Sequence, residues 1–308
     1  MTRSVAGLAE LSARLGRSPE LDTLVSVALG GIDDLFGYRH SMLLLLDEEG
    51  TRLYTLASHG YDAQGIGSEV QLGEGIIGMC ASRARPMRIG NLGTMRRYAQ
   101  SVRRAYEESV GEAPGNEIPL PGLPSPQSQL AVPAMVLGQL VGVVAVESQE
   151  ASAFDDEDEA LLTVVAGLVA SAVEVDTAEE RLAEGAPLSL PAKAAPAPRA
   201  AATQVRFFAV DGSVFLDGEY LIKGVAGRIL WALLGHHDRE GRTEFTNREV
   251  RLDPMLELPE FRDNLESRLI LLKRRLEERA APVRIVKTGR GRFRLEVAGA
   301  LALDAIGS

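Results

Sequence analysis

The chain has 308 residues, of which 45% are hydrophobic, and this length gives a prior of two domains. A formal net charge of -10 argues against broad contact with nucleic acid, and a single cysteine excludes an internal disulfide framework. No apolar run reaches the roughly 18 residues of a membrane-spanning helix, and the amphipathic N-terminus lacks the apolar core of a secretory signal. We therefore expect a cytoplasmic protein with no membrane partner.

The first half of the chain predicts a mixed α+β domain. Helical patterns cover about 3–16 and 20–36, and HSMLLLLDEEGTRLYTLASHG then predicts two strands around an acidic glycine turn. The stretch LGEGIIGMCASRARPMRIG predicts a glycine-rich turn, a short helix and a strand. Residues 94–127 are irregular and rich in proline, and QLAVPAMVLGQLVGVVAVES predicts a hairpin of two buried strands around Gly138.

A helix that follows FDDEDE closes this first domain. Its core face is predicted from the helical spacing of Leu161, Val165, Leu168 and Ala172. The acidic residues in its first turn complement the partial positive charge at the N-terminus of a helix.

This order of elements resembles a GAF domain, the small-molecule sensor fold with a central antiparallel sheet and helices on either side. The resemblance rests on Gly73, Gly75 and Gly78 before RARPMRI, and on VGVVAVES followed by FDDEDEALL. It covers roughly 3–175 and implies an unidentified small-molecule ligand. In this family the region that corresponds to 94–127 usually builds part of the ligand pocket, but the sequence identifies no ligand-binding residue and no cofactor.

Cys80 shares a helix face with Ile76, so we expect it to pack in the core, although a thiol sensor or a bilin attachment site is the sharper alternative. Free-methionine-sulfoxide reductases also use a GAF fold, but their chemistry needs more than one cysteine. We therefore expect no catalytic residues and no enzyme, with a redox enzyme based on Cys80 as the weaker alternative.

Part of a cyclic-nucleotide motif is present in the same half. Phe154 followed by Asp158 and Glu159 matches its second half, whereas Glu147 and Ser148 replace the Asn-Lys pair of its first half. Aromatic and acidic residues in this order are also common where a helix is capped at its N-terminus.

Residues 184–204 hold four prolines and eight alanines, which predicts a semi-extended linker. It separates a sensor and dimerisation domain, 1–183, from a second domain, 205–298, which is followed by a tail, 299–308. Charge is divided in the same way, because 205–308 carries a net charge of +2 within a chain of net charge -10.

The second domain begins with strands in VRFFAV, SVFLD and EYLIK, linked by Asp-Gly turns at 211–212 and 217–218. A helix is predicted at 224–237, then a short strand in EFT, and Asn247 is a suitable N-cap for a short helix. A longer helix at about 260–279 precedes VRIVKTGRGRFRLEV, which reads as a hairpin with a basic turn.

This pattern resembles the winged-helix effector domain of OmpR-type response regulators, with NREV, LKRRL and FRL as shared features over about 205–297. The resemblance implies double-stranded DNA as a partner, with the longer helix in the major groove and the hairpin as the wing. Ordinary solvated surface charge is the alternative reading. Arg274 on the helix and Arg290 at the turn are the first choices, and Phe293 is expected to anchor the wing in the core. The full set of candidate DNA contacts is Arg262, Lys273, Arg274, Arg275, Lys287, Arg290, Arg292 and Arg294.

Ile270 and Leu271 depart from the polar or basic residues that OmpR-type domains commonly carry on the outer side of this helix. As exposed aliphatic side chains they could contact thymine methyl groups, mark a protein-binding surface, or pack against another part of the full-length molecule. His236 and His237 lie at a helix end without nearby Cys or His partners, so we expect no metal site.

These features together predict a one-component transcriptional regulator of the bacterial type. Its sensor would form a homodimer through helices near 3–36 and 156–183 and would control a tethered DNA-binding domain. The alternative is a signalling adaptor whose winged helix binds protein rather than DNA.

Overall fold

The computed structural model describes residues 2–18, 20–92, 118–183, 202–253, 256 and 265–307. The chain forms two compact units, an N-terminal unit, Met1–Val175, and a C-terminal unit, Asp176–Ser308. Of the predicted linker 184–204, residues 184–201 lie outside the described residues, and Thr203 and Gln204 belong to a strand. Most of the predicted irregular stretch, up to 117, also lies outside them.

The N-terminal unit is built on a six-stranded antiparallel sheet with the order β3-β2-β1-β6-β5-β4. Its strands are β1 (His40–Leu46), β2 (Arg52–His59), β3 (Glu69–Gln71), β4 (Met87–Ile89), β5 (Ser128–Val136) and β6 (Gln139–Ser148). The β5–β6 turn places Leu137 and Gly138 at positive φ, as a tight two-residue hairpin turn requires. The predicted hairpin around Gly138 is thereby confirmed.

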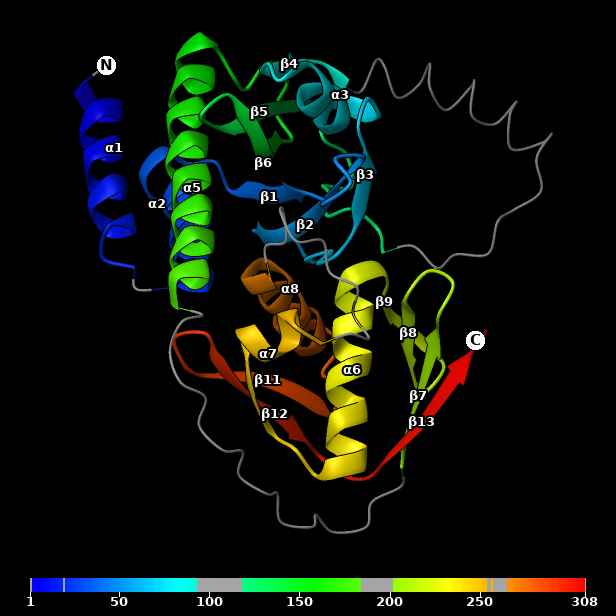
Figure 1. The fold of residues 1–308 in the computed structure, drawn as a ribbon. Coiled ribbons are helices and arrows are strands. Elements are labelled where there is room, and N and C mark those ends of the chain that lie inside the picture. Colours follow the sequence, from blue (N-terminus) through cyan, green and yellow to red (C-terminus); the bar gives the residue numbers. More distant parts are fainter. Residues whose placement is uncertain are drawn as a thin grey trace, which may run out of the picture. The chain divides into compact units, whose positions relative to one another are not determined.

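Helices cover both faces of this sheet. They are α1 (Thr2–Leu15), α2 (Leu21–Phe36), α3 (Gly75–Arg83) and α5 (Asp156–Ala183), close to the predicted bounds. Figure 1 shows α1, α2 and α5 on one side of the sheet and α3 on the other. Because both faces are covered, β1 is buried almost without alternation. Close packing of α1 on α2 depends on Gly31, where an added Cβ would lie 2.5 Å from Leu11 Cδ1.

The core face of α5 differs from the predicted one. Its most buried stripe consists of Leu162, Val165, Ala166, Val169 and Val173. Leu161 and Val165 are buried as predicted, whereas Leu168 and Ala172 are only half-buried. The helix carries apolar or small residues on nearly every side between 160 and 173, so its spacing alone allows more than one inward face.

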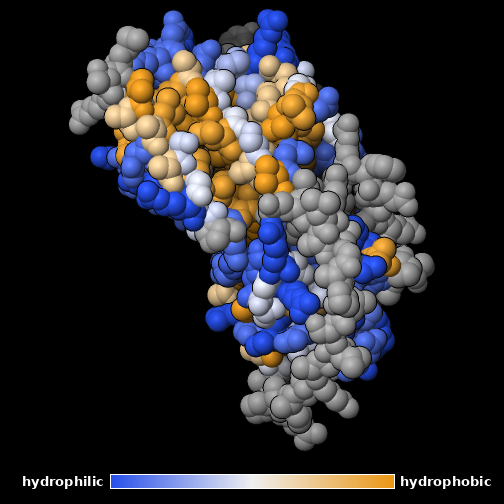
Figure 2. All heavy atoms as spheres, turned by 60° about the vertical axis from the view of Figure 1, so that its left-hand side comes forward, coloured by the Kyte–Doolittle hydropathy of each residue, from blue (hydrophilic) through white to orange (hydrophobic). Residues whose placement is uncertain are grey.

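The outward side of α5 is therefore also apolar. Val164 and Val175 are 49% and 56% exposed, and Val5 of α1 is 67% exposed. Figure 2 shows a continuous band of hydrophobic residues over the N-terminal unit on the side that carries α1 and α5. An apolar surface of this kind marks a place where another surface can bind.

The C-terminal unit contains a four-stranded sheet with the order β13-β7-β8-β9. Its strands are β7 (Thr203–Phe208), β8 (Ser213–Leu216), β9 (Glu219–Ile222) and β13 (Leu301–Ile306). Asp217 and Gly218 take positive φ in the tight β8–β9 turn, as their Asp-Gly sequence predicts. The segment 299–308, assigned to a tail from the sequence, instead supplies β13, which pairs in parallel with β7.

The described part of this unit also contains three helices and a second sheet. They are α6 (Gly224–Glu240), α7 (Asn247–Arg251), α8 (Leu265–Glu278) and a three-stranded antiparallel sheet of β10 (Glu244–Thr246), β12 (Arg292–Val297) and β11 (Val283–Gly289). Residues 260–264 of the predicted long helix lie outside the described residues. The N-cap of α7 is not Asn247 but the residue before it, Thr246, which forms a capping box with Glu249.

The predicted inward stripe of α8 is confirmed, since Leu265, Leu269, Leu272 and Leu276 are all at most 5% exposed. In α6, Trp231 stacks on Phe207 of β7 with ring centroids 5.0 Å apart. Within the described residues, no helix combines the length and apolar character that crossing a bilayer requires.

Candidate functional site

The β11–β12 hairpin separates apolar from charged side chains, as its period-two pattern predicts. Ile285, Phe293 and Leu295 are buried, and the Phe293 ring stacks on Phe245 with centroids 5.8 Å apart. Phe293 is therefore the core anchor that the sequence predicted. The opposite face exposes Arg284, Arg292, Arg294 and Glu296.

Acidic neighbours offset part of the charge on this face. Arg294 Nη2 donates to Glu244 Oε1 at 3.2 Å, and Glu296 lies opposite Arg284 in the strand register. Arg290 and Arg292 flank Gly291 at the exposed turn, where the two strands end. The turn is thus the part of the hairpin where cationic side chains are concentrated.

Two of the predicted DNA contacts have partners within the C-terminal unit. Arg275 is 6% exposed, its Nε donates to the Leu221 carbonyl at 2.8 Å, and its Nη1 lies 2.6 Å from Glu278 Oε2. Lys287 is partly buried, and its Nζ lies 2.7 Å from Glu266 Oε1. Both side chains reach back into the unit because buried carbonyl and carboxylate oxygens need donors.

The outward side of α8 is less accessible than the sequence predicted. Ile270 and Leu271 are 4% and 2% exposed, so the expectation that they are exposed is wrong. Their burial agrees with their aliphatic character, because each such side chain gains about 1.5–3 kcal/mol on leaving water. Lys273 and Arg274 are half-buried, and Arg262 lies outside the described residues.

The histidine pair at the end of α6 forms ordinary structural contacts. His236 Nε2 lies 2.9 Å from Asp253 Oδ2, and His237 Nδ1 lies 3.1 Å from the Arg242 carbonyl oxygen. Within the residues that the structure describes, no cluster of three or more His, Cys, Asp or Glu side chains is placed to hold a metal ion.

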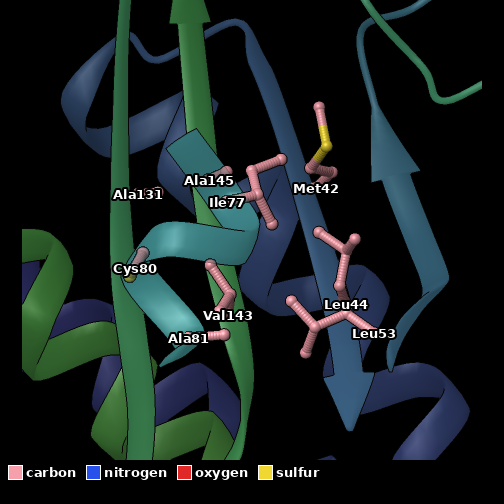
Figure 3. Close-up of a cluster of buried hydrophobic side chains, with 9 residues drawn as sticks. All are labelled: Met42, Leu44, Leu53, Ile77, Cys80, Ala81, Ala131, Val143 and Ala145. Carbon is pink, nitrogen blue, oxygen red and sulfur yellow. The ribbon is translucent and has the colours of Figure 1, made fainter. Parts of the chain in front are cut away.

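In the N-terminal unit, α3 packs on an apolar sheet face (Figure 3). The buried cluster comprises Met42, Leu44, Leu53, Ile77, Cys80, Ala81, Ala131, Val143 and Ala145. Cys80 is fully buried among them, and this burial raises the pKa of its thiol to about 12. A thiol that stays protonated is a poor nucleophile, so the core assignment of Cys80 is confirmed.

A polar corner adjoins this apolar face at the end of β6. Glu147 is 8% exposed and accepts hydrogen bonds from the Leu123 backbone N at 3.0 Å and from Gln129 Nε2 at 3.2 Å. Burial, followed by the negative charge of Glu147, raises the pKa of the Tyr61 hydroxyl. The Tyr61 ring lies 5.5 Å from the His40 ring, and burial lowers the pKa of His40.

The alternation of residues along β6 is a sequence signal for this polar corner. Val143, Ala145 and Glu147 are every second residue of β6, so their side chains lie on the same face of the sheet. The Glu147 carboxylate therefore points to the face that carries the apolar cluster. The corner can supply a carboxylate, a phenol and an imidazole to the polar end of a small molecule.

The family model for the GAF domain matches residues 18–174, which is about half of the chain. The chain belongs to the GAF domain family. No curated protein matches it.

Similar solved structures include the GAF domain of a phosphoenolpyruvate-protein phosphotransferase from Acinetobacter, with 20% identity, a TM-score of 0.46 and coverage of 56% of this chain and 94% of that chain. A second is the GAF domain of the corresponding Coxiella burnetii protein, with 16% identity, a TM-score of 0.45 and coverage of 58% and 98%. A third is a free methionine-R-sulfoxide reductase from Neisseria meningitidis in complex with its substrate, with 15% identity, a TM-score of 0.41 and coverage of 53% and 84%. Similarity at this level does not assign a ligand or an activity.

The acidic residues at the start of α5 in this GAF domain form a helix cap. Asp155 Oδ1 accepts from the backbone N of Glu157 at 2.8 Å and of Asp158 at 3.1 Å, while Asp158 Oδ2 accepts from the Asp155 backbone N. Phe154 is buried beside them. Of the residues that match half of a cyclic-nucleotide motif, Asp158 is therefore engaged in capping.

We expect the GAF domain thiol to resist alkylation. In the folded chain, Cys80 should react with iodoacetamide at pH 8 at least about a hundredfold more slowly than in urea, because burial blocks access and disfavours the thiolate. Mass spectrometry of the alkylated protein measures this ratio. Equal rates in the folded and unfolded chain would contradict the core assignment.

Proposed function

We propose that the chain is a one-component transcriptional regulator. In this proposal the GAF domain binds a small molecule, and the C-terminal unit is an OmpR-type winged helix that binds double-stranded DNA in the cytoplasm. The order of its elements is consistent with this assignment, with strands β7–β9 first, then helices α6, α7 and α8, and the β11–β12 hairpin, although β13 follows the hairpin. The chain would act by binding and not by catalysis, since its one cysteine is buried in the core.

The exposed turn that carries Arg290 and Arg292 is the observation on which the DNA proposal rests. The stretch 262–294 holds eleven basic and four acidic residues in a chain whose net charge is -10. A polyanion that avoids the acidic remainder of the chain would meet this local positive charge first. Arginine at a hairpin turn also suits the narrow, strongly negative minor groove beside a recognition helix.

Burial along α8 changes which residues support the proposal. All residues from Leu265 to Leu272 are buried, so the hairpin turn and Arg274 are better placed for DNA contact than the first two turns of α8. The adaptor alternative was favoured by Ile270 and Leu271 as exposed side chains and by the net charge of only +2 on 205–308. The burial of Ile270 and Leu271 removes the first of these two arguments.

Salt-dependent DNA binding by the full-length chain tests the proposal. Phosphate contacts release counterions, so the affinity for a mixed-sequence duplex should fall steeply between about 50 and 200 mM salt. Fluorescence anisotropy with a labelled duplex measures this dependence. Absence of DNA binding at the low end of this range would contradict the DNA-binding half of the proposal.

The ligand of the GAF domain is proposed to be a small molecule with an apolar body and a hydrogen-bonding end. The cluster around Met42 and Ile77 is apolar, whereas Glu147, Tyr61 and His40 place polar atoms at its margin. Mass spectrometry of small molecules retained by the purified chain, compared with a Glu147→Ala variant, would identify such a ligand.

We further propose that the regulator is a homodimer joined through the outward side of α5 and through α1. The stretch ALLTVVAGLVASAV, residues 160–173, contains no charged residue. Two copies of an acidic chain can approach along an uncharged face with little repulsion, and burial of Val5, Val164 and Val175 would favour the contact. Such a dimer would bring two winged helices to paired DNA half-sites.

The variant Val164→Glu should weaken this dimer at least tenfold, because it would bury an unpaired charge at the interface. Sedimentation equilibrium measures the dissociation constant. The matched control is Leu137→Glu, which adds the same charge at a 97% exposed residue of the β5–β6 turn and should leave the constant unchanged. A Val164→Glu chain that dimerises like the unaltered chain would contradict this interface.

A further inference from the structure

Glu266, in the first turn of α8, connects three elements of the C-terminal unit. Its side chain is nearly buried. Lys287 Nζ of β11 lies 2.7 Å from Glu266 Oε1, and Asn247 Nδ2 at the start of α7 donates to Glu266 Oε2 at 3.2 Å. Each carboxylate oxygen thus receives a donor from a different element.

Asn247 extends this connection to the hairpin turn. Its backbone N donates to the Gly291 carbonyl oxygen at 2.9 Å, and the neighbouring Thr246 pairs with Arg292 in the sheet register. Asn247 is itself only 4% exposed, and the capping box of Thr246 fixes the start of α7. Two hydrogen bonds in sequence therefore connect α8 through the buried Asn247 to the turn that carries Arg290 and Arg292.

The hairpin also carries buried side chains of a different kind. Val283, Ile285 and Leu295 are apolar and buried, and apolar packing holds surfaces together with little directional preference. Charge-assisted hydrogen bonds are directional and roughly twice as strong as neutral ones. A buried carboxylate is also costly unless it is paired, so its two donors are held in place.

We infer that Glu266 is a positioning residue that fixes the hairpin turn relative to α8. It sets where Arg290 and Arg292 lie without contacting a ligand itself, and it offsets the charge of Lys287. That these arginines meet DNA rests on the proposed function, whereas the clamp made by Glu266 does not. If the clamp is disrupted, the turn should sample a wider range of positions, and Arg290 and Arg292 should be held less accurately against any phosphate they contact.

Paired spin labels on the full-length chain test the clamp directly. Cysteines introduced at Thr288, near the turn, and at Glu277, near the end of α8, are both exposed, while native Cys80 is buried and resists labelling. Pulsed electron resonance measures the distribution of distances between the labels. Glu266→Ala should roughly double its width, because the turn loses the carboxylate that joins it to α8.

Two further variants separate the clamp from general damage. Lys287→Met keeps the aliphatic stem but removes the cation, so it should also broaden the distribution of distances. It therefore tests the loss of the Glu266–Lys287 ion pair even if Glu266→Ala does not fold. Lys273→Met is the control: it removes a lysine of α8 instead of Lys287 of β11, and it should leave the distribution of distances unchanged. Emission from Trp231, the chain's single tryptophan, reports whether the C-terminal unit is folded. A folded Lys287→Met chain with an unaltered distribution would overturn the inference.

The DNA measurement then distinguishes the clamp from the proposed function. If the chain binds DNA, Glu266→Gln should weaken binding about three- to tenfold although it removes a negative charge that by itself repels DNA. Stronger binding by Glu266→Gln would overturn the positioning role. If the unaltered chain binds no DNA while Lys287→Met broadens the label distances, the proposed function fails and the clamp stands.

Discussion

Replacing both Arg290 and Arg292 with alanine is expected to weaken binding of a mixed-sequence DNA duplex by the full-length chain about a hundredfold at low salt. Two charge-assisted hydrogen bonds to phosphate account for this loss at about 1.5 kcal/mol each. The slope of log affinity against log salt should become shallower by about two. Each phosphate contact that is lost lowers the number of counterions released on binding by about one. Both quantities follow from the same anisotropy titrations.

The matched control removes two arginines from the other unit. Arg52 and Arg83 are exposed on the GAF domain, so Arg52→Ala with Arg83→Ala makes the same change in net charge away from the hairpin. This control should bind DNA with nearly the unaltered salt slope. If the two double variants behave alike, total charge governs binding, and the hairpin turn is not the DNA-contacting surface.

Phe293→Ala is expected to destabilise the C-terminal unit by about 3–5 kcal/mol, the usual loss when a buried aromatic ring is truncated to a methyl group. The ring is 3% exposed and stacks on Phe245, so it ties the hairpin to β10 and the helices. Urea unfolding followed by Trp231 fluorescence isolates this unit, because the chain has one tryptophan and it lies in α6.

Two milder variants serve as comparisons for Phe293→Ala. Phe293→Leu should cost about 1–1.5 kcal/mol, because most of the apolar volume is kept. Val297→Ala removes a half-buried side chain from the same strand and should cost less than about 1 kcal/mol. A loss for Phe293→Ala no larger than that for Val297→Ala would show that the ring does not anchor the hairpin.

Much of the fold was predictable because short-range rules determine it. Alternation along β12 placed Phe293 and Leu295 inward, and the Asp217-Gly218 pair specified a tight turn. The face of α5 was not determined in this way, because a helix that is apolar on most sides has no unique inward stripe. Burial of Leu162 rather than Leu168 is decided by tertiary packing.

The candidate sites were less predictable, because long side chains choose partners that are distant in sequence. Arg275 lies on a flank of α8 that looked suited to phosphate, yet it donates to the Leu221 carbonyl, 54 positions earlier. Lys287 of β11 likewise pairs with Glu266 of α8, which lies 21 positions earlier in the sequence. Glu147 was visible as an inward position of β6, but its donors depend on the strand register, which places Gln129 of β5 opposite it, and on the path of the chain at Leu123.

The parallel pairing of β13 with β7 sets the shortest fragment suitable for separate study of the C-terminal unit. A fragment that stops at 298, just after β12, would remove Leu301–Ile306 and leave β7 as an unpaired sheet edge. Exposed edges of this kind recruit strands from other copies and promote aggregation. A soluble fragment should therefore run from Thr203 through Ile306, with any purification tag separated from β13 by a flexible spacer.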